Sequence, residues 1–196
     1  KLKNQFAILK PKTSICAVCF KNKTPSLIDI YKEQKMCDKC FSELKVTFHK
    51  EKIGGIEILS IFEYNEAMKT ILFTYKGLGD IELHSVFLER YSLYLKLKYR
   101  KYILVPAPST LESEKIRGFN HVEHIFSGVN SNILHLLHKK ENFKQSDLSF
   151  TERQKVHKKI EIINGEKLRN KKVLIIDDLK TTGATIKAII ELITPF

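Results

Sequence analysis

Two short apolar runs in the second half of the chain are each followed by residues that end a strand. Residues 102–105 and 173–176 carry apolar, mostly branched side chains, which is typical of strands buried in a parallel sheet. The first run ends at Pro106-Ala107-Pro108 and the second at Asp177-Asp178. Beyond the second run, four isoleucines recur at the spacing of an amphipathic helix that covers a sheet, namely Ile186, Ile189, Ile190 and Ile193. The pattern predicts an α/β domain.

A strand and two helices are predicted before the first of these runs. Residues 56–64 alternate loosely between apolar and polar types, as the opening strand of a second domain would. Asn65 is a suitable N-cap for a helix that ends at Gly77 and Gly79, with apolar positions at Met68, Ile71, Leu72 and Tyr75. A second helix is predicted over residues 85–98.

Two further segments follow the proline-containing loop. Residues 112–119 are polar, charged and interrupted by Gly118, which favours a mobile loop carrying Lys115 and Arg117. Asn120 predicts the start of a long helix with one apolar stripe of core residues: Val122, Ile125, Phe126, Val129, Ile133, Leu136 and Leu137. Four histidines lie on or near this helix without a matching carboxylate or cysteine cluster, so we interpret them as solvent-facing or rim residues: His121, His124, His135 and His138.

The loop before the last helix has the composition of a phosphate and ribose site. A helix N-terminus offers unpaired N–H groups to an anion, and ligands gather outside the carboxyl ends of parallel strands. Gly183 and Ala184 would let a phosphate approach the backbone, with further donors from the hydroxyls of Thr181, Thr182 and Thr185. The acidic pair would accept hydrogen bonds from sugar hydroxyls or act through water on bound Mg²⁺. An ordinary strand-to-helix turn with an Asp-Thr cap is the alternative.

All four cysteines fall near the start of the chain, as two Cys-x2-Cys pairs: Cys16, Cys19, Cys37 and Cys40. This spacing is typical of a closed, structural Zn²⁺ site of four thiolates. Disulfides are the alternative, and the absence of cysteine from the rest of the chain argues against them. Such a zinc ribbon could contact nucleic acid, dock another protein or brace the neighbouring domain, and we favour docking or bracing. We predict a zinc-ribbon module over residues 1–50 and a second domain over residues 51–196.

Charge and hydropathy limit the classes of partner. Lysine and arginine outnumber acidic residues by 34 to 22 among 196 residues, a formal net charge of +12. The excess favours polyanionic partners, although a generally lysine-rich surface would explain it equally well. No apolar run approaches the roughly 20 residues needed to span a bilayer, so we expect a cytoplasmic protein without membrane insertion.

Residues 173–185 resemble the signature of the type I phosphoribosyltransferases, which consists of an apolar strand, two acidic residues and a Thr-Thr-Gly-Ala-Thr-like loop. Together with the two cysteine pairs, a lysine-containing helix end before Gly-Asp, Val105-Pro-x-Pro and Arg117-Gly-Phe-Asn120, they look like the ComF family. The resemblance also picks up Glu123 and residues 145–153. It departs from the family at Val156, where an asparagine is common, and at Lys180, which adds a charge to the loop.

The resemblance implies a type I phosphoribosyltransferase-like fold that binds phosphoribosyl pyrophosphate (PRPP) with Mg²⁺. The implied PRPP-binding residues are Asp177, Asp178, Leu179, Lys180, Thr181, Thr182, Gly183, Ala184 and Thr185. Weaker, implied pyrophosphate contacts are Lys76, Pro106, Ala107, Pro108, Ser109 and Arg117.

ComF proteins serve DNA uptake and natural transformation, so the resemblance implies a cytoplasmic protein that handles incoming single-stranded DNA. DNA-translocation or competence proteins are further expected partners. A nucleobase-salvage phosphoribosyltransferase remains an alternative, although no hood for a base is visible in the sequence. A non-catalytic adaptor that docks on the translocation machinery is another.

Overall fold

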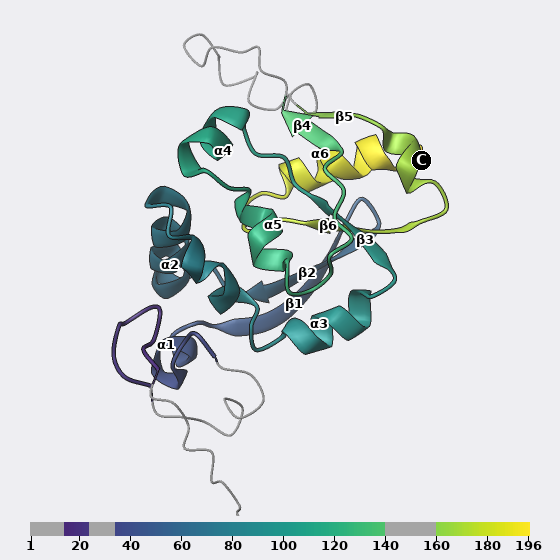
Figure 1. The fold of residues 1–196 in the computed structure, drawn as a ribbon. Helices are drawn as coiled ribbons and strands as arrows, with labels where there is room; N and C mark the ends of the chain where they lie inside the picture. The colour runs from purple at the N-terminus through teal and green to yellow at the C-terminus, as the bar shows by residue number, and fades with distance from the viewer. Residues whose placement is uncertain (1–13, 24–33, 140–159) are drawn as a thin grey trace, which may run out of the picture.

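The computed structural model describes residues 14–23, 34–139 and 160–196, which form a mixed α/β fold (Figure 1). Residues 145–153 and Val156, named in the family resemblance, lie outside this part of the chain. In the described part, no helix is long and apolar enough to cross a membrane. The elements in chain order, with two 3₁₀ helices written η, are α1 (Asp38–Ser42), β1 (Val46–Ile53), β2 (Ile56–Phe62), α2 (Glu66–Gly77), η2 (Ile81–Phe87), α3 (Ser92–Tyr99), β3 (Tyr102–Pro106), α4 (Leu111–Arg117), α5 (His121–Phe126), β4 (Leu137–Lys139), β5 (Ile160–Ile162), η6 (Gly165–Leu168), β6 (Lys172–Ile176) and α6 (Ala184–Ile193).

The two predicted apolar runs form the parallel strands β3 and β6, paired in register from Tyr102 with Lys172 to Pro106 with Ile176. Successive side chains of a strand point to opposite faces of its sheet. Ile103 and Val105 therefore pack in one cluster with Ala188 and Ile189 of α6, whereas Leu104 packs in another with residues of α5. Helices thus flank the parallel pair on both faces (Figure 1). The predicted α/β fold class is confirmed.

Strands β1 and β2 form an antiparallel hairpin that lies beside the parallel pair. Strand β2 confirms the strand predicted at residues 56–64, whereas β1 was not predicted, because few of its residues are apolar and none is fully buried. The hairpin spans residue 50, where the sequence analysis places the domain boundary. That division remains a prediction.

Helix α2 begins and ends where its caps predict. The side-chain oxygen of Asn65 accepts a hydrogen bond from the Met68 backbone N–H at 2.9 Å, which satisfies one of the unpaired donors of the first turn. The predicted apolar positions Met68, Ile71, Leu72 and Tyr75 are all buried. This packing places Lys76, in the last turn, at the edge of the parallel pair.

The prediction of a single helix over residues 85–98 is wrong over its first half. Residues up to Phe87 belong to η2, and α3 begins only at Ser92. Between them, the buried Glu89 carboxylate accepts hydrogen bonds from the backbone N–H groups of Lys35 and Met36, at 2.7 and 3.0 Å. These long-range bonds hold the chain in a turn that the local sequence pattern does not reveal.

The mobile loop predicted over residues 112–119 is instead helix α4. The Thr110 hydroxyl caps it by accepting a bond from the Ser113 N–H at 3.2 Å. Acidic residues stand in its first turn and basic ones in its last, as the helix dipole favours, and Gly118 ends it with φ 80°. The polar residues of this segment favoured the prediction of a loop, but a short surface helix tolerates polar residues.

The long helix predicted from Asn120 ends at Phe126. Asn120 caps it as expected, accepting a bond from the Glu123 N–H at 3.0 Å. The chain then turns, and the Asn130 side chain donates to the carbonyls of Tyr99 and Tyr102. Ile133 reaches the free edge of β3, where it forms a parallel bridge with Leu104. Most of the apolar residues predicted for this helix are buried. The later ones, however, lie in extended segments beside strands and not on a helix.

Candidate functional site

The acidic pair stands where the carboxyl ends of β3 and β6 meet. Ile176 ends β6, and its carbonyl accepts a hydrogen bond from the Ala107 N–H at 2.8 Å. The loop after β3 therefore runs beside Asp177 and Asp178, at the edge where parallel sheets collect ligands.

A cavity of about 250 Å³ opens at this edge. Eight predicted residues line it, namely Lys76, Ala107, Pro108, Ser109, Arg117, Asp177, Asp178 and Thr185. The sequence analysis missed five others: Thr110, Ser113, His121, Val122 and Lys139. The remaining predicted residues, Pro106, Leu179, Lys180, Thr181, Thr182, Gly183 and Ala184, are not part of its lining. The cavity therefore combines acidic, basic and hydroxyl groups from segments far apart in the chain.

Lys76 and Asp178 form the closest ion pair of the cavity, with Nζ and Oδ2 2.6 Å apart. The Asp178 side chain is 6% exposed and that of Lys76 is 33% exposed. Removing a carboxylate from water is costly, and a charge-assisted hydrogen bond of this length offsets part of that cost. The ammonium group predicted to contact pyrophosphate thus already neutralises one member of the acidic pair.

The two carboxyl groups have opposite proton affinities. Burial, and next the charge of Asp178, raise the pKa of Asp177 from 3.8 to about 7. Burial also acts to raise the pKa of Asp178, but His121 and Lys76 together hold it well below its usual range. Asp178 is therefore ionised at neutral pH, whereas Asp177 is poised to gain or lose a proton, and a nearby cation would favour its loss.

His121 does not face solvent as the sequence analysis expected. Its side chain is 7% exposed, with Nε2 3.6 Å from Asp178 Oδ1 and Nδ1 2.6 Å from an Arg117 guanidinium nitrogen. Because a guanidinium can only donate, Nδ1 accepts, which leaves the ring hydrogen on Nε2, toward Asp178. The hydroxyl of the fully buried Tyr75 donates to the His121 carbonyl at 2.8 Å and fixes the start of α5.

The position of His121 could have been suspected from the sequence. It directly follows the Arg117-Gly-Phe-Asn120 segment, and a helix capped at Asn120 places residue 121 in the first turn, next to the arginine. His124, His135 and His138 are at least partly exposed, as expected.

Gly183 shapes the predicted phosphate loop where α6 begins. Its φ is 76°, a left-handed conformation, and an added Cβ would lie 2.6 Å from Cδ1 of Ile53 in β1. The hairpin is therefore packed directly against the loop. Thr181 and Thr182 are exposed, and Lys180 pairs with Glu51 of β1 at 3.0 Å rather than entering the cavity.

The loop after β3 is held by α4 and α5. The Ser109 hydroxyl donates to the Glu114 carboxylate, which also accepts a bond from the Asn120 side chain at 2.8 Å. One carboxylate thus links the strand-end loop, the helix α4 and the N-cap of α5.

The four cysteines converge as predicted. Their sulfur atoms all lie within 4.8 Å of one another, and those of Cys19 and Cys37 are 3.8 Å apart. A tetrahedral ion with metal–sulfur bonds of about 2.3 Å would place its sulfurs about 3.8 Å apart. The Cys16 sulfur accepts hydrogen bonds from the Val18 and Cys37 N–H groups, which suits a thiolate. The cluster could therefore hold a metal ion.

The cysteine cluster packs against the neighbouring helices. Cys16 and Cys40 are buried in one hydrophobic cluster with residues of α2, η2, α3 and α5. Met36 and Leu44, next to the second cysteine pair, are 1% and 4% exposed in that cluster. Of the three roles left open by the sequence, bracing of the neighbouring elements fits this packing.

Comparison with known proteins identifies relatives of the chain. It is 37% identical over 139 residues, 71% of its length, to the competence protein ComFC of Streptococcus pneumoniae. It is 33% identical over 129 residues, 65% of its length, to the competence protein ComFC of Bacillus subtilis. These matches span 62% and 53% of the two relatives, and no protein-family model matches the chain. These similarities make the chain a homologue of the competence proteins ComFC over about two thirds of its length.

Proposed function

We propose that the chain is a PRPP-binding, phosphoribosyltransferase-like protein of bacterial DNA uptake and natural transformation, acting on incoming single-stranded DNA in the cytoplasm. The observation that carries the PRPP part is the cavity at the carboxyl ends of β3 and β6. It brings an acidic pair, Lys76, Arg117 and several hydroxyl groups into one space.

The residues present fit the parts of PRPP and its cation. The start of α6 and Thr185 offer N–H and hydroxyl donors to the 5′-phosphate, while the acidic pair suits the ribose hydroxyls. Lys76, Arg117 and the loop from Ala107 to Ser109 would meet the pyrophosphate. Mg²⁺ would offset the phosphate charge, and it would favour the ionised form of Asp177.

Binding is the central proposal, and transfer of the phosphoribosyl group is the enzymatic alternative. A salvage enzyme would need a surface that selects a nucleobase at the cavity mouth, and we assign no such surface. In the cysteine cluster we propose structural Zn²⁺, because four cysteine sulfurs within 4.8 Å of one another suit that ion.

The role in DNA uptake rests on the two relatives, both named competence protein ComFC. Single-stranded DNA is the partner that the net charge of +12 suits, since a polyanion gains affinity from lysine and arginine. Other competence or DNA-translocation proteins are a further class of proposed partner.

Calorimetric titration with PRPP, in the presence and absence of Mg²⁺, tests the cavity. The wild type should bind PRPP with Mg²⁺, and the double variant Asp177→Asn/Asp178→Asn should lose at least about tenfold in affinity, because its carboxylates no longer serve the sugar or the cation. Glu161→Gln, an exposed change on β5 outside the cavity lining, is the control and should bind like the wild type. If the wild type binds no PRPP, the proposal fails.

A further inference from the structure

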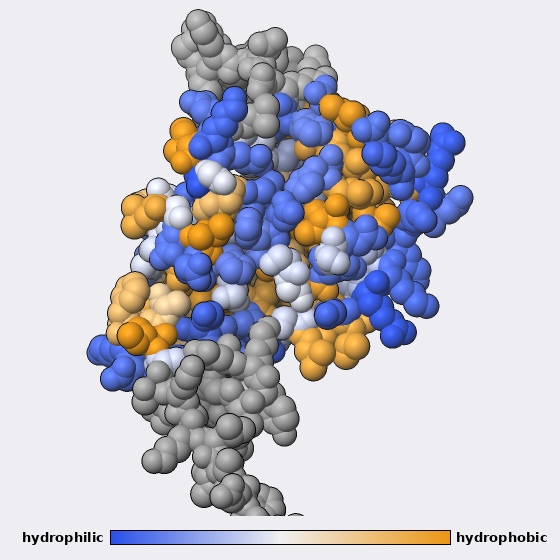
Figure 2. Space-filling view, in the orientation of Figure 1, coloured by the Kyte–Doolittle hydropathy of each residue, from blue (hydrophilic) through white to orange (hydrophobic). Residues whose placement is uncertain are grey.

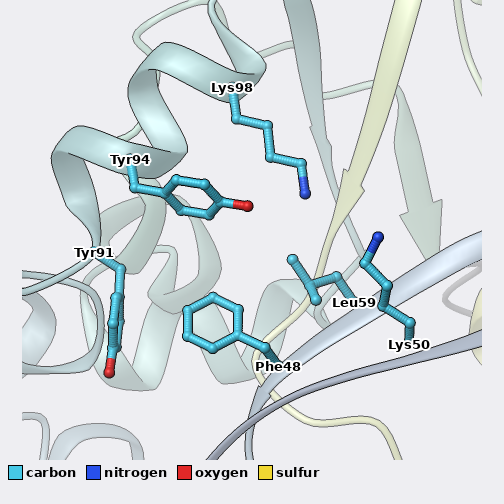
Figure 3. Close-up of a pocket in the computed structure, with 6 residues that line it drawn as sticks. All are labelled: Phe48, Lys50, Leu59, Tyr91, Tyr94 and Lys98. Carbon is cyan, nitrogen blue, oxygen red and sulfur yellow. The ribbon is translucent and has the colours of Figure 1, made fainter.

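A second cavity, of about 360 Å³, lies between the hairpin and helix α3 (Figure 3). The hairpin contributes Phe48, Lys50 and Leu59, and the other wall consists of Tyr91 with Tyr94 and Lys98 of α3. We call these six residues the aromatic cleft. Its lining has three aromatic rings, two lysines and no acidic side chain, and it shares no residue with the cavity that holds the acidic pair.

Phe48 reaches the cleft through an irregular strand. Its φ is 46°, a conformation that bulky side chains rarely adopt, and the pairing register of β1 shifts between Val46 and His49. The ring makes edge-to-face contacts with Tyr91 and Tyr94, with centroids 5.0 and 6.2 Å apart. Despite this packing, Tyr94 remains 50% exposed. The bulge thus turns an aromatic ring toward the cleft.

The two lysines give the cleft a positive mouth. Figure 3 shows the ammonium groups of Lys98 and Lys50 on the same side of the cleft, beside Leu59. Lys98 lies 5.6 Å from the centroid of Tyr94 and 5.1 Å from that of Tyr99. Lys50 pairs with Glu57 at 3.1 Å, but both side chains are more than half exposed, and such a pair is weak enough for a phosphate to replace it.

Aromatic rings and lysines continue to alternate beyond the cleft. Tyr99 contacts Tyr102 edge-to-face at 5.4 Å, and the Lys172 ammonium lies 5.9 Å from the Tyr102 centroid. Tyr102 and Lys172 are paired at the first positions of β3 and β6, so this track runs at the opposite end of the strands from the acidic pair. Where α3 lies in Figure 1, Figure 2 shows hydrophobic residues among hydrophilic ones on the surface.

We infer that the aromatic cleft is a binding site for the bases and phosphates of single-stranded nucleic acid. The exposed Tyr94 ring can stack on any base, and the lysines beside it can neutralise the flanking phosphates, which is the combination that sequence-tolerant single-strand binding requires. The positive mouth favours this polyanion over an apolar peptide. The inference rests on the proposed handling of single-stranded DNA, and it assigns that ligand to a surface separate from the proposed PRPP cavity.

Fluorescence anisotropy of the full chain with a labelled oligothymidylate at low salt tests the cleft. Tyr94→Leu should weaken binding about 5- to 100-fold, because it removes one stacking ring from an exposed position. Tyr64→Leu is the matched control, because Tyr64 is also 50% exposed but does not line the cleft. Lys98→Gln should lower the slope of log affinity against log salt by about 0.7, one phosphate contact, whereas Lys69→Gln on α2 should leave it unchanged.

The outcomes separate this inference from the proposal on which it rests. No binding of oligothymidylate by the wild type at low salt would overturn both. Equal affinity of the wild type and Tyr94→Leu would overturn the cleft alone and leave single-strand binding to another surface. Loss of affinity in Tyr94→Leu with unchanged PRPP binding would support two independent sites. A loss of the same size in Tyr64→Leu would contradict the assignment.

Discussion

The acidic pair makes a sharp prediction about stability and pH. In the folded protein the pKa of Asp177 is raised from 3.8 to about 7, so between these values the folded state keeps a proton that the unfolded state has lost. Stability contributed by this group is therefore greatest at low pH and falls as the pH rises toward 7. At about 1.4 kcal/mol for each pH unit, the interval corresponds to a loss of about 4 kcal/mol.

Asp177→Asn removes the titrating group and keeps its shape. Its free energy of unfolding, relative to the wild type, should rise by about 2 to 3 kcal/mol between pH 5 and pH 8. For a chain of this size, this corresponds to an increase of about 5 to 10 °C in the difference between melting temperatures. Thermal unfolding followed by circular dichroism across this pH range, without PRPP or added Mg²⁺, measures it.

Asp178→Asn provides the contrast, because His121 and Lys76 hold the pKa of Asp178 below its usual range against the effect of burial. That variant should be less stable than the wild type at neutral pH, and the deficit should shrink as the pH falls below about 4. The reasoning is refuted if the Asp177→Asn difference does not change with pH, or if both variants shift in the same direction at pH 8.

Three further predictions concern the surroundings of the cavity and the cysteine cluster. Lys76→Met should lower the free energy of unfolding in urea by about 1 to 3 kcal/mol, because it leaves the buried Asp178 carboxylate without its cation. Lys69→Met, which loses only an exposed pair with Glu66, should lower it by less than about 0.5 kcal/mol. Equal losses would contradict the role of the Lys76–Asp178 pair. Gly183→Ala should destabilise the protein by more than Gly118→Ala, because both residues have a left-handed backbone but only at Gly183 would the new methyl group meet Ile53. Adding Ile53→Ala to Gly183→Ala should recover part of the lost stability, and no recovery would show that this contact is unimportant. Removing bound metal with a chelator should lower the temperature of the main melting transition, because the cysteine cluster shares a hydrophobic core with α2. A separate small transition, with the main one unchanged, would instead indicate an independent module.

Local signals in the sequence predicted several elements correctly. The apolar runs at 102–105 and 173–176, the Asn65 and Asn120 caps, and the cysteine pairs each depend on interactions within a few residues or on a fixed ligand geometry. Such features can be predicted without knowing the fold, because the unpaired donor of a helix end or the ligand set of a metal is satisfied by residues close by in the sequence.

Predictions failed where distant residues decide the local structure. Glu89 accepts bonds from residues more than 50 positions earlier and so interrupts the expected helix. Asn130 bonds to Tyr99 and Tyr102, and the chain after it joins the edge of β3 instead of continuing as a helix. Polar composition alone made α4 resemble a loop. In each case a specific tertiary hydrogen bond or a cap outweighed average propensity.

The sequence by itself determined the chemistry available to this protein: the acidic pair, the small hydroxyl-rich loop, the four thiols and the excess of lysine. The tertiary structure alone decided which groups meet. It set Lys76 against Asp178, turned His121 inward and brought Phe48 opposite Tyr94 across the aromatic cleft. A residue's type fixes its charge and hydrogen-bonding capacity, but its burial and its partners come from strands and helices far apart in the chain, and these set its pKa and its role.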